Sequence, residues 1–141
     1  MNIGKWNIKT RDLNKIKFNA VDFDEKDYIE YDVWLDDANY VHNLEAMSKF
    51  FDEHFGCKML QCTNYKDINN NDIYELNKVK ITIDEKEDSI AYVVYLNSDF
   101  VFKIISGDLL NYDILPVSYI IDTTSAKIEI IDKFDFENIK E

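Results

Sequence analysis

The chain has 141 residues, of which 28 are acidic and 16 are basic, so its formal net charge is −12. This charge excludes a general nucleic-acid binder, because phosphate contacts need a surplus of Lys and Arg. With 46% apolar and 14% aromatic residues, the composition is typical of a globular protein. The length predicts a single domain, residues 1–141, whose core needs neither a disulfide nor a metal.

Asn, Lys, Ile and Tyr together supply 56 residues, a bias typical of translation from an AT-rich genome, which indicates a bacterium or its phage. The segment from Met1 to Trp6 lacks the apolar core of a signal peptide. No apolar run approaches the ~20 residues of a membrane span. We therefore expect a cytoplasmic protein that has no membrane partner.

The first expected strand covers residues 28–35, after a segment, residues 1–21, that allows either a short helix or a strand. Its side chains alternate between an apolar and a mixed face. The apolar face holds Ile29, Tyr31, Val33 and Leu35, and the other face holds Tyr28, Glu30, Asp32 and Trp34.

A long amphipathic helix is predicted over about residues 38–55. Asp36 or Asp37 can cap its first free N–H groups, and Gly56 stands where a left-handed C-cap is easiest for glycine. Its apolar residues recur at spacings of three and four, namely Val41, Leu44, Met47, Phe51 and Phe55.

The second half of the chain reads mostly as strands. Residues 58–64 and 79–83 favour strands, and residues 90–96 are apolar throughout, which is typical of a central strand. Residues 100–105 fit a strand or a helix, and the two Phe of the tail can dock or remain frayed. The fold class expected is α+β, a mostly antiparallel sheet with the long helix packed on it.

The segment after residue 116 predicts a hairpin. Residues 117–121 and 127–131 are its strands, a loop of five residues joins them, and Pro116 can open the first strand, where a missing N–H is tolerated.

The cysteines, Cys57 and Cys62, are expected to be reduced structural thiols. On one strand they would lie ~16 Å apart, at ~3.3 Å per residue, which is too far for a disulfide. A zinc site needs more ligands at tighter spacing.

No local motif indicates catalysis or a metal site. His42 and His54 are 12 residues apart on the predicted helix, so they are separated by about 120° around it and about 18 Å along it, and they cannot share a metal. The loop 67–72 resembles the start of an EF-hand, but Asp72 and Lys78 stand where glycine and glutamate are required. Nucleophile and phosphate-loop motifs are absent from the sequence. We therefore expect no cofactor, no metal and no catalytic residue, and a protein that is not an enzyme.

The distribution of charge is more informative than its sum. Residues 1–21 carry +4, residues 22–37 carry −7 and residues 38–141 carry −9. The run 22–37 can be a solvated face that the basic residues near the N-terminus neutralise. It can also be a binding surface, since carboxylates steer association and aromatic residues anchor it.

The binding interpretation gives six candidate contact residues, namely Tyr28, Glu30, Asp32, Trp34, Asp36 and Asp37. Because four of these residues are acidic and two are aromatic, they predict a basic protein as the partner and no binding of nucleic acid. We expect an immunity protein that neutralises a cationic bacterial toxin such as a nuclease, because its carboxylates would cover a positive substrate groove.

Three alternatives stay open. A phage-encoded mimic of DNA would use the same carboxylates but needs them in two phosphate-like rows. A small-ligand or enzymatic domain would enclose a deep pocket lined by Tyr92, Tyr95 or His42. A structural subunit would form an obligate dimer, and the sequence leaves the oligomeric state undecided.

Overall fold

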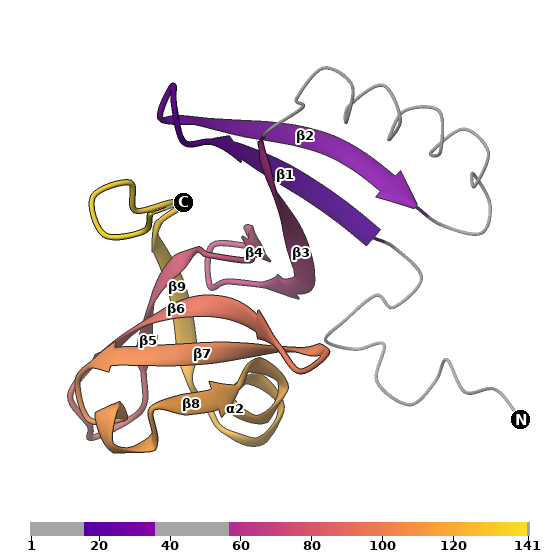
Figure 1. Ribbon diagram of the computed structural model, residues 1–141. Coiled ribbons are helices and arrows are strands. Elements are labelled where there is room, and N and C mark those ends of the chain that lie inside the picture. The colour runs from indigo at the N-terminus through magenta and orange to yellow at the C-terminus, as the bar shows by residue number, and fades with distance from the viewer. Residues whose placement is uncertain (1–15, 36–56, 141) are drawn as a thin grey trace, which may run out of the picture.

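The computed structural model describes residues 16–35 and 57–140, which form two antiparallel sheets and two short helices (Figure 1). The first sheet has the strand order β2-β1-β3-β4. Its strands are β1 (Ile16–Asp22), β2 (Asp27–Leu35), β3 (Lys58–Lys66) and β4 (Asp72–Tyr74). The predicted helix over 38–55, with Asp36, Asp37, His42 and His54, lies outside the described residues.

The second sheet has the strand order β8-β7-β6-β5-β9. Its strands are β5 (Lys78–Thr82), β6 (Ser89–Leu96), β7 (Asp99–Ser106), β8 (Ile114–Pro116) and β9 (Lys127–Asp132). A 3-10 helix, η2 (Leu110–Tyr112), precedes β8, and the α-helix α2 (Val117–Thr123) follows it. The α+β class with a mostly antiparallel sheet is therefore confirmed.

Most of the expected strands are present. The segments predicted as strands over 28–35, 58–64 and 79–83 correspond to β2, β3 and β5. The apolar segment 90–96 is β6, which occupies the centre of the second sheet as predicted. The ambiguous segment 100–105 is a strand, β7, and pairs with β6 from Ile90 to Leu96.

The hairpin predicted over 117–131 is wrong in its first half, because Val117–Thr123 form α2. Val117 and Ile120, three positions apart, are buried on one side of the helix, and Tyr119 is exposed on the other. β-branched residues favoured a strand, but packing against the sheet overrides such a local preference. Pro116 accordingly ends β8 and stands at the N-cap of α2 instead of opening a strand.

The main core lies between the second sheet, α2 and one end of the first sheet. Tyr65 and Ile73 of β3 and β4 belong to the same buried cluster as the side chains of β5, β6 and β7. The fully buried members include Val79, Val93, Phe102 and Val117. This continuity explains how β3 and β4 fix the first sheet against the second one.

A smaller cluster joins the C-terminal segment to the first sheet. Val21, Leu60 and Phe134 are buried together, and Phe23 and Phe136 pack around them. The rings of Phe23 and Phe134 meet edge to face, with centroids 5.6 Å apart. The tail therefore docks on the first sheet, where Ile139 also packs against the cluster.

Both cysteines carry free thiols, as expected. Cys62 is buried in β3, and burial raises the pKa of its thiol to about 11. Burial and the nearby carboxylates of Asp22 and Asp27 also raise the pKa of Cys57. Both residues therefore stay protonated at neutral pH, which suits a structural role better than nucleophilic or ligand chemistry.

The loop between β3 and β4 is built around the buried side chain of Asp67. Its Oδ1 accepts hydrogen bonds from the N–H groups of Asn69 and Asn71, both at 2.9 Å. The loop expected over 67–72 is thus a loop as far as Asn71, and Asp72 begins the short strand β4.

Candidate partner-binding site

Residues 22–27, which we call the acidic turn, connect β1 to β2. The Oδ1 atom of Asp22 accepts hydrogen bonds from the backbone N–H groups of Asp24 at 3.0 Å and Glu25 at 3.1 Å. The side chains of Asp24, Glu25 and Asp27 are exposed. Because the Asp22 bonds fix the backbone, these carboxylates are presented on a preorganised turn.

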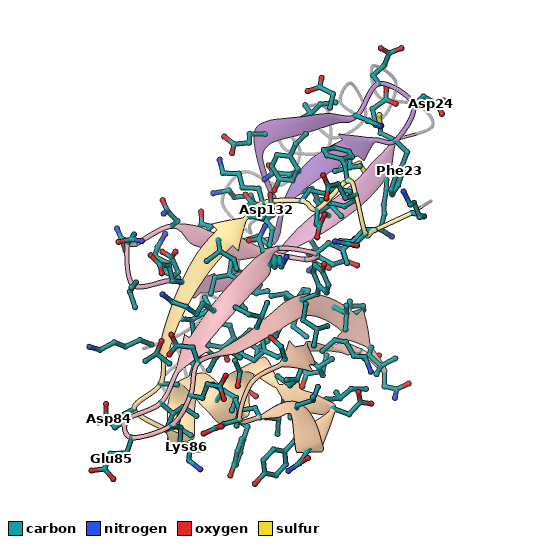
Figure 2. The ribbon with its side chains drawn as sticks, turned by 90° about the vertical axis from the view of Figure 1, so that its left-hand side faces the viewer. Phe23, Asp24, Asp84, Glu85, Lys86 and Asp132 are labelled. Atoms are coloured by element: carbon teal, nitrogen blue, oxygen red, sulfur yellow. The ribbon has the colours of Figure 1, made fainter. Side chains whose placement is uncertain are left out.

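Phe23 anchors the acidic turn to the C-terminal segment, through the edge-to-face contact of its ring with that of Phe134. A second exposed acidic turn, residues 84–88, lies at the other end of the part of the molecule drawn. Figure 2 shows Asp24 at one end and Asp84 and Glu85 at the other. The five residues of this turn, 84–88, are all exposed.

The predicted contact residues lie on β2 and beyond it. Tyr28 and Glu30 have described side chains, while Asp32 and Trp34 are placed only as backbone positions of β2. Trp34 is paired with Lys17 of β1. Asp36 and Asp37 lie outside the described residues. The structure thus brings Tyr28 and Glu30 together, on the wall of a cleft.

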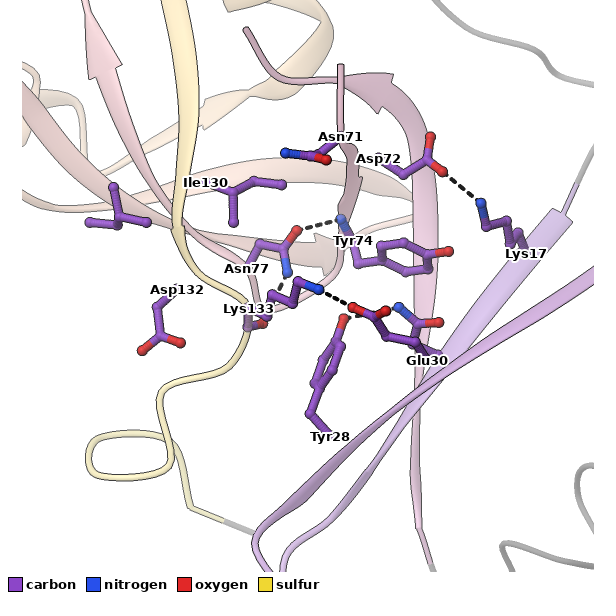
Figure 3. A pocket seen from close by; sticks show the side chains of 12 residues that line it. Lys17, Tyr28, Glu30, Asn71, Asp72, Tyr74, Asn77, Ile130, Asp132 and Lys133 are labelled. Carbon is purple, nitrogen blue, oxygen red and sulfur yellow. Dashed lines mark hydrogen bonds and ion pairs between the residues drawn. The ribbon is translucent and has the colours of Figure 1, made fainter. Parts of the chain in front are cut away.

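This cleft, which we call the inter-sheet cleft, has a volume of about 650 Å³. Residues of β1, β2, β4 and β9 line it, so both sheets contribute (Figure 3). Its walls are mostly polar. The side chains that line it include Lys17, Asn19, Tyr28, Glu30, Asp72, Tyr74, Asn77, Asp132 and Lys133.

Glu30 is paired across the cleft with Lys133, which follows β9. The two side chains are 57% and 61% exposed, respectively. The backbone carbonyl of Lys133 accepts a hydrogen bond of 2.9 Å from Nδ2 of Asn77, and Oδ1 of Asn77 accepts one of 2.8 Å from the N–H of Tyr74. Buried Asn77 therefore holds the end of β9 against β4.

Asp72 forms the second charged group of the cleft. Its carboxylate contacts Nζ of Lys17 at 2.6 Å and Nζ of Lys66 at 2.8 Å. Partial burial would raise its pKa, but the hydrogen bonds from the two ammonium groups outweigh burial and lower it. Lys17 also lies 5.9 Å from the centre of the Tyr74 ring. Two cations thus share one carboxylate at this end of the cleft.

Tyr28 differs from the solvent-facing position that the alternation on β2 suggests. It is half-buried and packs at the edge of the Val21, Leu60 and Phe134 cluster. Its phenolic oxygen accepts a hydrogen bond of 3.0 Å from Nδ2 of Asn19. Burial raises the pKa of Tyr28, so the phenol is neutral and remains a hydrogen-bond donor at physiological pH.

The aromatic residues expected to line a ligand pocket are distributed differently. The hydroxyl of Tyr92 donates to Oδ2 of Asp135 at 2.8 Å, outside the inter-sheet cleft. Tyr95 is 50% exposed and lines a second hollow, of about 540 Å³, beside Phe23 and Leu76. The two tyrosines therefore do not share a pocket, and His42 lies outside the described residues.

Sequence reasoning missed Lys17, Asn77, Asp132 and Lys133 as parts of the site. Lys133 is 103 positions from Glu30 and carries no local signature, so only the pairing of the strands brings it to the cleft. Among the described residues, no group of three or more His, Cys, Asp or Glu side chains is arranged to hold a metal ion.

Comparisons with known proteins give no family. No protein-family model matches the chain, and no curated protein matches it.

Within the described part of the chain, none of the helices has the length and apolar character needed to cross a membrane.

Proposed function

We propose that this protein is a small acidic binding protein that captures a basic protein, and that it serves as a cytoplasmic immunity protein against a cationic bacterial toxin such as a nuclease. The observation that carries the proposal is the acidic turn. Asp24, Glu25 and Asp27 are exposed there, on a backbone fixed by Asp22 and anchored by Phe23.

Preorganisation is what makes this turn suitable for binding. A partner that docks on a fixed turn does not have to order it, so less of the interaction free energy is lost on association. Figure 2 shows Asp24 of this turn at one end of the part of the molecule drawn, where the exposed carboxylates of the turn can steer a positively charged surface into contact. The net charge of −12 adds a long-range attraction in the same direction.

The proposed surface continues from the acidic turn along β2. Tyr28 and Glu30 follow directly and line the inter-sheet cleft. The sequence extends the run of acidic and aromatic residues through Asp32, Trp34, Asp36 and Asp37. A toxin whose substrate groove is positive would meet carboxylates first and aromatic surface second.

The experiment is binding to the product of the adjacent gene, measured at low and high salt. We expect tight association that weakens with ionic strength, because exposed charges are screened beyond about 8 Å at physiological salt. Co-expression should also protect cells from that product. A neighbour that is not toxic, together with no basic protein recovered from the native cells, would overturn the proposal.

Two charge-reversal variants locate the surface. Asp24→Lys, Glu25→Lys and Asp27→Lys combined should lower the association rate constant at least tenfold. The matched control is Asp84→Lys, Glu85→Lys and Glu87→Lys combined, on the exposed turn at the opposite end. Equal effects of the two triple variants would place the contact elsewhere and would show that only total charge matters.

A further inference from the structure

The ion pair between Glu30 and Lys133 closes part of the inter-sheet cleft without being buried itself. Both side chains remain more than half exposed, at 57% and 61%. Exposed pairs of this kind contribute little to stability, since they gain modest Coulomb energy and pay for ordering two long side chains. The contact can therefore open at low cost.

The backbone of Lys133 is held independently of that ion pair. Its carbonyl accepts the hydrogen bond from Asn77, and the N–H of the next residue, Phe134, donates to Oδ1 of Asp132 at 3.2 Å. Phe134 is only 5% exposed. The Lys133 side chain can therefore leave Glu30 while the chain around it stays in place.

Departure of Lys133 would leave the carboxylate of Glu30 without its cation in the cleft. The half-buried Tyr28 forms the adjacent wall (Figure 3). The carboxylate of Asp132 also lines the cleft, but it is turned away from Glu30 and accepts the hydrogen bond from the N–H of Phe134. The cations at the other end, Lys17 and Lys66, are already engaged with Asp72. The vacated end is thus complementary to a cation that offers several hydrogen-bond donors.

We propose that the ammonium group of Lys133 occupies, in the free protein, the position that a cation of the partner takes in the complex. A guanidinium side chain of the partner then replaces Lys133 at Glu30 in the inter-sheet cleft. The inference rests on the proposed function, because it assumes a basic protein partner. Guanidinium is preferred to ammonium because its planar fork of donors can engage two acceptors at once and can lie against an aromatic ring. In this exchange the partner gains a specific contact, and no buried bond of this chain is broken.

The experiment needs no identified partner. The chain is titrated with N-acetyl-arginine amide and followed by the side-chain amide NMR signals of Asn19 and Asn77, which line the cleft. Lys133→Met removes the internal competitor and should tighten binding about two- to fivefold, the range expected for releasing an exposed ion pair. Glu30→Gln should abolish the shifts, and N-acetyl-lysine amide should bind more weakly than the arginine probe.

The matched control is the exposed ion pair between Lys103 and Asp113, whose side chains are 44% and 64% exposed. Lys103→Met and Asp113→Asn should leave the titration unchanged. If Lys133→Met fails to tighten binding, or if Glu30→Gln binds like the wild type, the exchange is wrong. Either result leaves intact a salt-sensitive complex that depends on the acidic turn, so failure here and failure of the proposed function are distinguishable.

Discussion

The carboxylate of Asp67 accepts a hydrogen bond of 3.1 Å from the backbone N–H of Ile130, a residue 63 positions away. Next to it, the N–H of Ile68 donates to the carbonyl of Ile128 at 2.9 Å. The carbonyl of Ile128 and the N–H of Ile130 both point away from β5, the neighbouring strand. The β3–β4 loop therefore covers the edge of β9, which would otherwise offer unpaired backbone groups. The same two bonds connect the first sheet to the second.

Replacing Asp67 should therefore destabilise the protein more than its position in a loop suggests. The side chain is 7% exposed and serves three backbone donors, those of Asn69, Asn71 and Ile130. We expect Asp67→Ala to lower the free energy of unfolding by about 2–4 kcal/mol, because three backbone donors lose their carboxylate acceptor at once. Urea denaturation measures the change. Asp84→Ala, in an exposed turn, is the control and should stay within about 0.5 kcal/mol of the wild type.

Acid should destabilise the C-terminal segment through Asp135. Hydrogen bonds from Asn138 and Tyr92 lower the pKa of this carboxyl to about 2, from an ordinary value of 3.8. A folded-state pKa below the unfolded one contributes stability that is complete above about pH 4 and is lost as the pH falls toward 2. Asp72, whose pKa is also lowered, adds to this trend.

We expect the urea concentration at the unfolding midpoint of the wild type to decrease as the pH is lowered from 4 to 2. Asp135→Asn should be less stable at pH 7 but should show a shallower decline across that window. An identical decline in the wild type and in the variant would contradict the assignment.

Alkaline pH should destabilise the protein through Tyr92, whose hydroxyl donates the hydrogen bond to Asp135. Burial and the hydrogen bond to Asp135 raise the pKa of Tyr92 to about 12, from 10.0. A raised pKa means that its contribution is complete below pH 10 and is lost as the pH rises toward 12. Ultraviolet titration of tyrosinate should show one ionisation near pH 12 that is absent from Tyr92→Phe. If Tyr92→Phe instead removes an ionisation near pH 10, the hydrogen bond between Tyr92 and Asp135 does not persist in solution.

Phe134 should be the most sensitive residue of the tail. It is 5% exposed and its ring contacts Phe23 and Phe136, with centroids 5.6 and 4.7 Å away. We expect Phe134→Ala to cost about 3–5 kcal/mol, since a large buried ring is removed. Limited proteolysis should then cut within residues 133–140. Tyr112→Ala serves as the control because Tyr112 is 63% exposed, and a similar loss in both variants would argue against docking.

Gly107 should tolerate no side chain. Its φ is +94°, and a Cβ there would lie 2.2 Å from the carbonyl oxygen of Asp88 and 2.5 Å from Cα of Ser89. Gly107→Ala should therefore destabilise the protein by well over about 1 kcal/mol, since strain and overlap with backbone both act. Ser106→Ala, at the exposed neighbouring position, should be nearly neutral by the same denaturation assay. Equal midpoints for the two variants would refute the overlap.

Local patterns in the sequence were sufficient for most of the strands. The alternation in residues 28–35 and 79–83 follows from the period of two in a strand with unlike faces. The apolar run at 90–96 correctly indicated a central strand, although only one face of β6 is fully buried and the strand is exposed at Tyr95 and Leu96. The acidic run is likewise a property of neighbouring residues. The same local reading failed at Val117–Thr123, where apolar residues fit either period and packing on the sheet selected the helix.

The sequence by itself therefore determined the fold class, the positions of β2, β5 and β6, and the segment in which negative charge concentrates. Only the tertiary structure decided that Glu30 meets Lys133 and that Asp67 meets Ile130, 103 and 63 positions apart. The physical reason is that periodicity and charge are properties of adjacent residues. The inter-sheet cleft instead depends on which strands pair, and pairing is set by the packing of the whole chain.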